Sequence, residues 1–275
     1  DAARYQEIQC RSALNPVKGM PFNWTLNPYR GCTHACHYCF ARRYQTQLEL
    51  GPDDHFSSFI LVKVNLVEVL KKELDRPTWT REQVAVGTAT DPYQPIEGHY
   101  KLTRGSLEAL LASRTPIGLV TKGPMVVRDA DLLAELGRRA DCRVYMSVPT
   151  VDEDAWRALE PGTAHPLQRL RAVRTLRDAG VQAGVLMAPV VPGFTTQPAK
   201  LEACVSEIQT NINRMMIDES PPPQPAIAAT TRETTSSVGT GMGCSSASIL
   251  STLLGSAGRG GCSAGMLVTP STMRR

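Results

Sequence analysis

The chain has 275 residues, of which 42% are hydrophobic and 20% charged, with a formal net charge of +4. This length can bury the core of one α/β domain, and the small positive charge mildly favours an anionic partner. No run of about 18 apolar residues predicts a membrane span, and the N-terminal residues lack the apolar core of a signal peptide. We therefore expect a cytoplasmic protein whose eight cysteines are free, metal-binding or catalytic rather than paired in disulfides.

Short β-branched runs alternate with amphipathic helical stretches from about residue 56 to residue 193. This alternation predicts βα units around a parallel sheet. The predicted strands are 59–65, 83–90, 117–122, 143–150 and 181–193, and the predicted helices are 66–74, 106–113, 129–140 and 166–179. Thr150 and Glu153 match a capping box, while Pro166 suits a first helical turn and Gly180 a helix end.

Polar residues recur where these strands stop, at Thr90, Asp91, Thr121, Lys122, Ser147 and Thr150. In a parallel α/β barrel the carboxyl ends of the strands converge on one mouth, where active sites lie. These residues are therefore candidates for a site. The alternative is that they are ordinary turn residues between strands and helices.

The composition changes beyond about residue 209, where Ser, Thr, Gly and Pro dominate and no aromatic residue remains. Such a segment cannot bury enough apolar surface to offset the entropy lost on ordering. We expect a core domain over 1–208 and a low-complexity, disordered tail over 209–275. The competing possibility is that the apolar patch 249–254 docks on an open barrel edge.

Three cysteines, Cys32, Cys36 and Cys39, lie in the segment "GCTHACHYCFAR". Structural zinc needs four ligands, and His34 and His37 inside this loop are poor companions to all three thiolates. Three unrelated buried thiols are a second alternative, which the spacing disfavours. An iron-sulfur cube normally takes four cysteines, so a set of three leaves one iron open to a substrate or cofactor.

The segment "CTHACHYC" resembles the CxxxCxΦC signature of the radical S-adenosylmethionine (SAM) superfamily, with Tyr38 as the aromatic residue Φ. The further blocks "NPYRGCTHACHYCFAR", "GTATDPYQPIEG", "LVTKGPMVVRD", "LEPGT" and "VLMAPVVPG" resemble the branch related to spore photoproduct lyase, described as DNA repair photolyase-like. The resemblance covers roughly residues 15–203.

This resemblance implies an α/β fold, a partial (β/α)6 barrel, with a 4Fe-4S cluster held by the three cysteines. In the superfamily, SAM binds the fourth iron of the cluster. One electron from the reduced cluster then cleaves SAM to methionine and a 5'-deoxyadenosyl radical. The cofactors carry the chemistry, and the protein orients them. The residues that the resemblance assigns to SAM are Tyr38 near the adenine, Thr90 and Asp91 near the amino group, Lys122 near the carboxylate and Ser147 near the ribose.

Two departures from the branch stand out. Spore photoproduct lyases have a hydrogen-donating cysteine just before the strand-end Ser-Asp, but "GTATDP" has none. The family barrel also continues past "APVVPG" through another helix and strand, which this chain replaces with the low-complexity tail, so the barrel is expected to be incomplete at its C-terminal side.

The leading hypothesis is a radical SAM enzyme that acts on a nucleic-acid lesion or nucleotide-like substrate and takes its electron from a donor such as a flavodoxin or ferredoxin. Two alternatives remain open. One keeps the radical chemistry but acts on a peptide or small metabolite. The other is a non-catalytic iron-sulfur protein that binds nucleic acid or senses redox state. The arginines Arg42, Arg43, Arg128, Arg138 and Arg139 do not decide among them, because such charges usually solvate helix faces.

Overall fold

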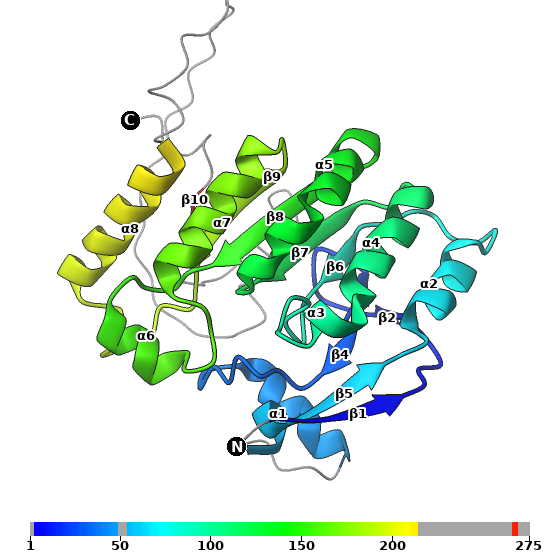
Figure 1. Cartoon of the computed structure of the whole chain (residues 1–275), viewed down its shortest axis with the longest axis horizontal. Helices are drawn as coiled ribbons and strands as arrows, with labels where there is room; N and C mark the ends of the chain where they lie inside the picture. Colours follow the sequence, from blue (N-terminus) through cyan, green and yellow to red (C-terminus); the bar gives the residue numbers. More distant parts are fainter. Residues whose placement is uncertain (1–2, 49–53, 214–265, 269–275) are drawn as a thin grey trace, which may run out of the picture.

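The computed structural model describes residues 3–48, 54–213 and 266–268, and it contains two sheets (Figure 1). The larger sheet has the strand order β10-β9-β8-β7-β6-β3-β2. Its strands are Met266–Val268, Gln182–Met187, Cys142–Ser147, Ile117–Thr121, Val84–Val86, Trp24–Leu26 and Leu14–Pro16, in that order. The five central strands, β9 to β3, are parallel, whereas β10 and β2 pair antiparallel at the edges. The α/β fold and the partial barrel expected from the sequence are thus confirmed.

The smaller sheet holds β1 (Arg4–Ile8), β5 (Phe59–Lys63) and β4 (Tyr29–Arg30). The sequence predicted 59–65 as a strand of the barrel series, and this is wrong, because β5 pairs with β1 and β4 instead. The first parallel strand is β3, which the sequence did not reveal. A β-branched run indicates burial but not the sheet that buries it, and β3 is only three residues long before an Asn-Pro turn.

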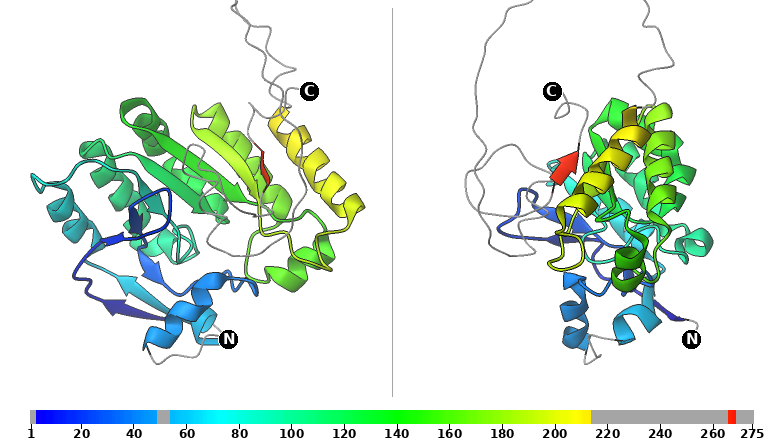
Figure 2. Two further views of the ribbon diagram at one scale, coloured as in Figure 1. Left: turned by 180° about the vertical axis from the view of Figure 1, so that it is seen from behind. Right: turned by 90° about the vertical axis from the view of Figure 1, so that its left-hand side faces the viewer.

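Helices pack along one face of the larger sheet (Figures 1 and 2). In chain order they are α2 (Leu66–Leu74), α4 (Leu102–Ala112), α5 (Ala130–Arg139), α7 (Pro166–Asp178) and α8 (Pro198–Asn213). The remaining helices of the described chain are η1 (Phe40–Leu48), α1 (Asp54–Ser58), α3 (Glu97–Tyr100), η2 (Pro124–Asp129) and α6 (Glu153–Leu159). None of the helices in the described part of the chain is long and apolar enough to span a membrane.

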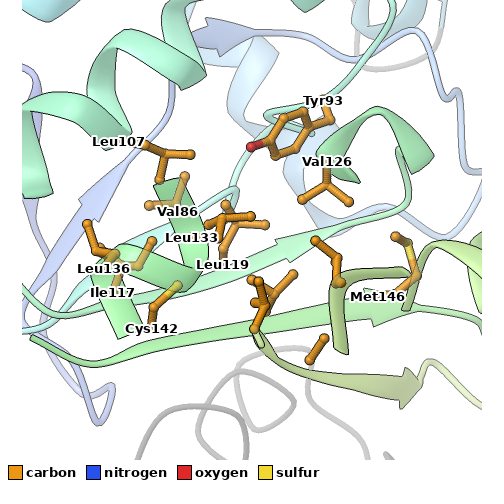
Figure 3. Close-up of a cluster of buried hydrophobic side chains, with 14 of the residues drawn as sticks. Val86, Tyr93, Leu107, Ile117, Leu119, Val126, Leu133, Leu136, Cys142 and Met146 are labelled. Atoms are coloured by element: carbon orange, nitrogen blue, oxygen red, sulfur yellow. The ribbon is translucent and has the colours of Figure 1, made fainter. Parts of the chain in front are cut away.

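The main core lies between the sheet and these helices, where Val86, Leu119 and Met146 meet Leu107 and Leu133 (Figure 3). The opposite face is also apolar, since Ala85, Tyr145 and Leu186 form a second buried cluster there. A sheet buried on both faces explains why the strands read as continuous hydrophobic runs rather than as alternating ones.

The strands end earlier than their hydrophobic runs suggested, and the polar residues lie in the loops that follow. Thr90 and Asp91 come after β6, Lys122 after β7, and Thr150 after β8. The predicted capping box is wrong: the N-cap of α6 is Asp152, whose Oδ1 accepts from the backbone N of Ala155 at 2.9 Å. Pro166 does begin α7, as predicted.

No sixth parallel strand follows β9 in the part of the chain that the structure describes. The edge of β9 is paired instead with the short antiparallel strand β10. Helix α8 continues to Asn213, across the domain boundary expected at residue 208. Within the tail expected over 209–275, residues 209–213 continue α8 and residues 266–268 form β10. The rest of that tail, including the patch 249–254 that was expected to be disordered or docked, lies outside the described ranges.

Candidate functional site

One cavity of about 390 Å³ opens at the carboxyl ends of four neighbouring strands, β6 to β9. This volume falls within the range of about 300–1,000 Å³ typical of small-molecule sites. All eight residues predicted from the sequence line it: Cys32, Cys36, Tyr38, Cys39, Thr90, Asp91, Lys122 and Ser147. We call it the first cavity. Residues far apart in the chain meet here because parallel strands bring their carboxyl ends to one edge.

The cysteine loop follows β4 and is held tightly against the rest of the molecule. Gly31 precedes it with φ +82°, and a Cβ there would lie 2.8 Å from the carbonyl O of Phe59, so glycine is required. Gly162 has a similar role by close approach, because its Cβ would lie 2.2 Å from the carbonyl O of Thr33. Backbone hydrogen bonds from Gly162 N to His34 O (3.1 Å) and from His37 N to Leu159 O (3.0 Å) fix the loop to the end of α6.

Arg42 stabilises the same loop from inside. Its Nε donates to the carbonyl O of Cys36 at 3.0 Å, and its Nη2 donates to that of Ala35 at 2.9 Å. The sequence could not show whether Arg42 serves function or only solvates a helix face. These two hydrogen bonds show that it supports the backbone of the cysteine loop. Arg128 pairs with Glu97 and Asp129, and Arg138 and Arg139 pair with Glu135.

The three thiols are free, and Cys32 and Cys36 are buried at the cavity wall. Burial raises the pKa of Cys36 to about 12 and also raises that of Cys39. Within the described residues, no three His, Cys, Asp or Glu side chains are grouped closely enough to hold a single metal ion, as structural zinc would require. Each thiolate of an iron-sulfur cube binds a different iron, so three thiols spaced around a cavity fit a cluster better than one ion. Binding would displace the thiol protons.

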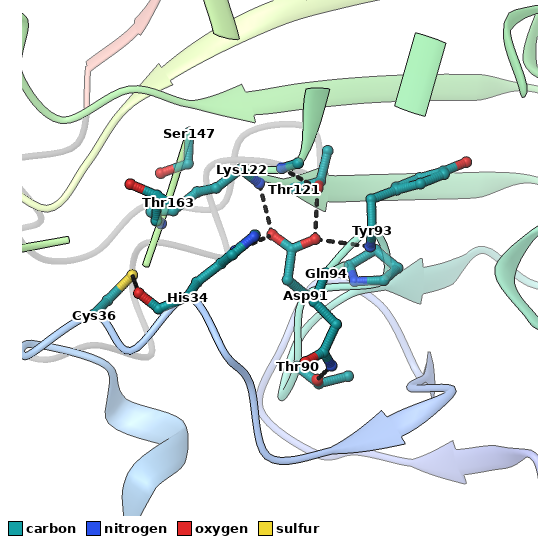
Figure 4. Close-up of polar contacts among 12 residues, drawn as sticks. His34, Cys36, Thr90, Asp91, Tyr93, Gln94, Thr121, Lys122, Ser147 and Thr163 are labelled. Carbon is teal, nitrogen blue, oxygen red and sulfur yellow. Dashed lines mark hydrogen bonds and ion pairs between the residues drawn. The ribbon is translucent and has the colours of Figure 1, made fainter. Parts of the chain in front are cut away.

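Asp91 occupies the centre of a hydrogen-bond network between strand ends (Figure 4). Its Oδ1 accepts from Thr121 Oγ1 (2.7 Å) and its Oδ2 from Lys122 N (2.7 Å). His34 Nδ1 lies 3.2 Å from Oδ2, which is ion-pair distance without good hydrogen-bond alignment. Burial works against the carboxylate, but the charge of His34 and these bonds lower the pKa of Asp91 to about 2. Asp91 is thus an ionised brace that ties the cysteine loop to β6 and β7.

Thr90 is also engaged with the cysteine loop. Its Oγ1 donates to the carbonyl O of Gly31 at 2.6 Å and accepts from Gln94 Nε2 at 3.0 Å. Gln94 in turn accepts from Thr33 N at 3.1 Å. Thr90 therefore lines the cavity while its hydroxyl sets the entry of the loop.

Lys122 lies over a buried polar group at the cavity wall. Its Nζ is 5.5 Å from the centre of the Tyr38 ring and 3.7 Å from Glu160 Oε1. Burial opposes its charge, but Cys36 and Glu160 raise the pKa of Lys122 above the usual value. Among the described residues Nζ makes no hydrogen bond, so this partly buried cation keeps its donors for another acceptor.

Glu160 is the centre of that polar group. Its Oε1 accepts from the Tyr38 hydroxyl, and its Oε2 accepts from Arg169 Nη2 at 2.6 Å. Burial works against the carboxylate, but the charges of Lys122 and Arg169 hold the pKa of Glu160 below its usual value. This network fixes the Tyr38 ring beside the cysteines.

Ser147 ends β8 and faces the same cavity. Its Oγ donates to the carbonyl O of Ala188 at 3.1 Å, and its own carbonyl O accepts from Arg169 Nη1 at 2.9 Å. Ser147 thereby joins the end of β9 to the Glu160 network.

The sequence did not single out Glu160, Arg169 or His34 as partners in this site. Glu160 belongs to the block "LEPGT", which carried only the resemblance. Arg169 interrupts the apolar stripe of a helix and reads as a solvated charge, yet its side chain is 0% exposed. No periodic pattern reports such a contact, because its partner is remote in sequence.

Comparison with known proteins identifies the family. The model of the Radical SAM superfamily matches residues 26–201. By fold, the chain resembles spore photoproduct lyase complexed with dinucleoside spore photoproduct, at a TM-score of 0.58 and 20% identity over 78% of this chain and 58% of that one. The fold predicted from the resemblance is confirmed.

Relatives in sequence are spread over bacteria, archaea and viruses. An uncharacterised protein of Mycobacterium bovis is 42% identical over 211 residues, 76% of this chain and 62% of its own length. An uncharacterised protein of Methanocaldococcus jannaschii is 26% identical over 68% of this chain and 67% of its own. A radical SAM Nα-GlyT isomerase of Pseudomonas phage M6 is 27% identical over 62% of this chain and 33% of its own. The chain spans about 62% of the mycobacterial relative, and it belongs to the Radical SAM superfamily, with the fold of spore photoproduct lyase.

Proposed function

We propose that this chain binds a 4Fe-4S cluster through Cys32, Cys36 and Cys39 and cleaves SAM reductively in the first cavity. The observation that carries the proposal is that all eight residues expected for this chemistry line that one cavity. They come from the cysteine loop and the ends of β6, β7 and β8. The non-catalytic alternative does not require SAM-contact residues beside the cysteines.

Bound together, the cluster and SAM supply one-electron chemistry and a 5'-deoxyadenosyl radical. The chain's own residues bind and orient. Lys122 offers its uncommitted ammonium donors to the SAM carboxylate, because a compact cation suits an anion in a buried site. The Tyr38 ring, fixed by Glu160, offers a flat surface to the adenine, and Ser147 a hydroxyl to the ribose.

Thr90 and Asp91 shape the site from below. Their side chains already bond to the cysteine loop and to the end of β7. Because these bonds fix the cavity wall at the end of β6, we assign Thr90 and Asp91 to the part of the site that receives the SAM amino group. Asp91 also supplies a negative charge near that group.

We further propose a nucleotide-like substrate or nucleic-acid lesion. Spore photoproduct lyase was solved with dinucleoside spore photoproduct, and the phage relative is named an Nα-GlyT isomerase. These names support the substrate class for this chain. The Thr88–Ala89 segment carries no thiol, so any hydrogen donor differs from the cysteine of spore photoproduct lyases.

The remaining proposals concern the setting of the enzyme. A flavodoxin or ferredoxin supplies the electron. Within the described residues, only the segment 32–39 has cysteines at the spacing of such a cluster, so the chain there offers no second cluster to relay an electron. We keep the proposal of a core domain over 1–208 and a tail over 209–275 that takes no part in the chemistry, although β10 in that tail pairs with β9. The protein is proposed to work in the cytoplasm, where thiols stay reduced.

The test is anaerobic reconstitution with iron and sulfide, followed by a SAM-cleavage assay with dithionite. We expect 5'-deoxyadenosine and methionine in equal amounts, and none from the Cys36→Ala variant. Cys204→Ala is the matched control, since Cys204 is a buried thiol outside the cavity. A reconstituted cluster that never yields 5'-deoxyadenosine would establish the non-catalytic alternative.

A further inference from the structure

A second cavity, of about 380 Å³, adjoins the first. It lies beside β2, β3 and β4 and reaches η1 and β5. The two cavities share a wall made of Phe40, Ala41, Phe56, Thr88 and Ala89. A molecule held in the second cavity therefore lies next to the site proposed for radical formation.

The charges around the two cavities differ. The second is lined by three cationic side chains, Arg30, Arg43 and Lys63, and by no Asp or Glu among the residues that the structure describes. The first contains the buried carboxylate of Asp91. A concave surface with cations and no carboxylate concentrates a positive potential and favours an anion.

Arg30 is the cation that the fold leaves available. It projects from β4 and is partly buried, and it has neither a hydrogen bond nor an ion pair from its side chain within the described residues. Lys63 Nζ, on the paired strand β5, donates to the carbonyl O of Asn27 at 2.7 Å. Burial lowers the pKa of Lys63, and the charge of Arg30 lowers it further, so the two cations repel each other. An anion between them would relieve that repulsion.

Aromatic rings complete the lining. Phe40 and Tyr44 meet edge to face with ring centres 6.1 Å apart, and Tyr44 is 38% exposed. Phe22 and Tyr29, which are both buried, line the same cavity. Cations that bind phosphate beside rings that stack on a base are the two elements of a nucleotide or single-strand binding site.

We propose that the second cavity is the anchoring subsite for the substrate, and that Arg30, Arg43 and Lys63 bind a phosphate group of a nucleotide while Tyr44 or Phe40 stacks on a base. A neighbouring nucleoside then extends past Thr88 and Ala89 into the first cavity. The assignment rests on the proposed function for the reaction, but the phosphate site can be tested without it.

The experiment measures binding by the reconstituted enzyme, with SAM, of a fluorescently labelled short single-stranded DNA of mixed sequence. Arg30→Gln and Arg43→Gln should each weaken binding by about tenfold, the cost of one lost hydrogen bond to a charged group. Each should also flatten the slope of log Kd against log salt by about 0.7 per phosphate contact removed. Arg139→Gln is the control, because Arg139 pairs with Glu135 on the exposed face of α5.

Competitors identify the source of the phosphate. Displacement by a mixture of deoxynucleoside monophosphates indicates a free nucleotide, whereas displacement only by unlabelled DNA indicates a nucleic-acid backbone, and both support the subsite. Equal displacement by an uncharged methylphosphonate strand of the same sequence would overturn it.

Two further readouts keep the result clear. The Arg30→Gln variant loses its value as a test if it also loses iron, because the change would then have disturbed the nearby cysteine loop. In that case Arg43→Gln and the stacking variant Tyr44→Ala test the subsite. Unchanged affinity and salt slope in these variants would refute the subsite. Formation of 5'-deoxyadenosine without DNA is measured in parallel, so a failed subsite with intact SAM cleavage leaves the proposed function standing.

Discussion

Two buried ionic networks in this molecule have almost the same composition and different surroundings. Between α3 and η2, Arg128 bonds Glu97 and Asp129 at 2.8 Å each, and Tyr93 donates to Asp129 at 3.0 Å. We call this the α3–η2 network. At the first cavity, Glu160 joins Arg169, Tyr38 and Lys122. Both combine a buried carboxylate with an arginine and a tyrosine, but the Arg128 side chain is 26% exposed whereas that of Arg169 is fully buried.

The difference is what each network leaves unsatisfied. Glu97, Arg128 and Asp129 line neither cavity, and their bonds are short and mutual. Lys122 stands 3.7 Å from its partner, has no hydrogen bond from Nζ in the described structure and faces a cavity. A buried ion pair by itself is therefore weak evidence for function, whereas a partly buried cation that faces a cavity and lacks a hydrogen-bond acceptor is stronger evidence.

The largest effect should come from the residues that no network can replace. Changing Cys32, Cys36 or Cys39 to Ala should abolish the brown chromophore, because two protein thiolates no longer anchor a cube. Iron, sulfide and absorbance measured after reconstitution check this. Cys142→Ala and Cys204→Ala should retain the cluster, and full iron in any of the three loop variants would sink the ligand assignment.

Breaking the α3–η2 network should lower the free energy of unfolding but leave SAM affinity unchanged. Glu97→Ala removes the partner of Arg128 and the acceptor for Tyr29 and for the backbone N of Thr103. We expect a loss of about 3 kcal/mol or more in the free energy of unfolding, measured by denaturant titration, with SAM affinity retained in the folded fraction. The exposed pair variant Glu153→Ala should cost less than about 1 kcal/mol. Weakened SAM binding in Glu97→Ala would erase the distinction between the networks.

For residues that line the first cavity, we expect a loss of SAM affinity while the cluster is retained. Lys122→Met should reduce SAM affinity by about tenfold or more, because a charge-assisted bond is lost, while iron content persists. Ser147→Ala should have a smaller effect in the same direction. Calorimetry on anaerobic, reconstituted protein measures both. If Lys122→Met, Ser147→Ala and Asp91→Asn all bind SAM unchanged, the assignment of strand ends to SAM is wrong.

Asp91 gives the comparison a dependence on pH. Its pKa falls from 3.8 to about 2 on folding, although burial opposes this, because His34 and the bonds from Thr121 and Lys122 favour the ionised form. A carboxylate with a lowered pKa stabilises the fold above the unfolded value and loses that contribution as the pH falls through the folded value.

We therefore expect about 2 kcal/mol of stability to disappear between about pH 4 and pH 2 in the chain without its cluster. Asp91→Asn should lack this portion of the acid transition, as followed by circular dichroism. The exposed Asp154→Asn should keep it. An acid transition of the same midpoint and steepness in Asp91→Asn would show that Asp91 does not brace the loop.

The smallest effect is expected from the C-terminal side. Ending the chain after Asn213 removes β10 but none of the described residues that line the first cavity. Iron content and SAM affinity should persist, with a stability loss of about 1 kcal/mol or less from the lost pairing with β9. Loss of the cluster in the truncated chain would make the edge of β9 part of the site.

Much of the site was predictable because its signals are local. The spacing of Cys32, Cys36 and Cys39, and the polar residues that follow strands, depend on short stretches of chain whose chemistry can be read directly. The helix limits at Pro166 and Gly180 are local for the same reason. The parallel order of β6 to β9 follows from the alternation of strands and helices.

Other features depended on contacts between distant residues. The sequence could not show that β5 joins β1 and β4 rather than the barrel, because a buried apolar run fits either sheet. It could not show that Arg169 is buried against Glu160, or that the Arg30 side chain has no polar partner among the residues that the structure describes. A charge is solvated or buried according to what packs over it.

Membership of the Radical SAM superfamily, the parallel α/β class and the polar residues at the strand ends could all be read from short stretches of residues. The folded chain adds that these residues line one cavity, that Asp91 and Glu160 are held by hydrogen bonds whereas Lys122 Nζ makes none among the described residues, and that a second, cationic cavity adjoins the first. Residue type and spacing fix what a group can do locally, but burial and pairing across the sheet decide which groups remain available to a ligand.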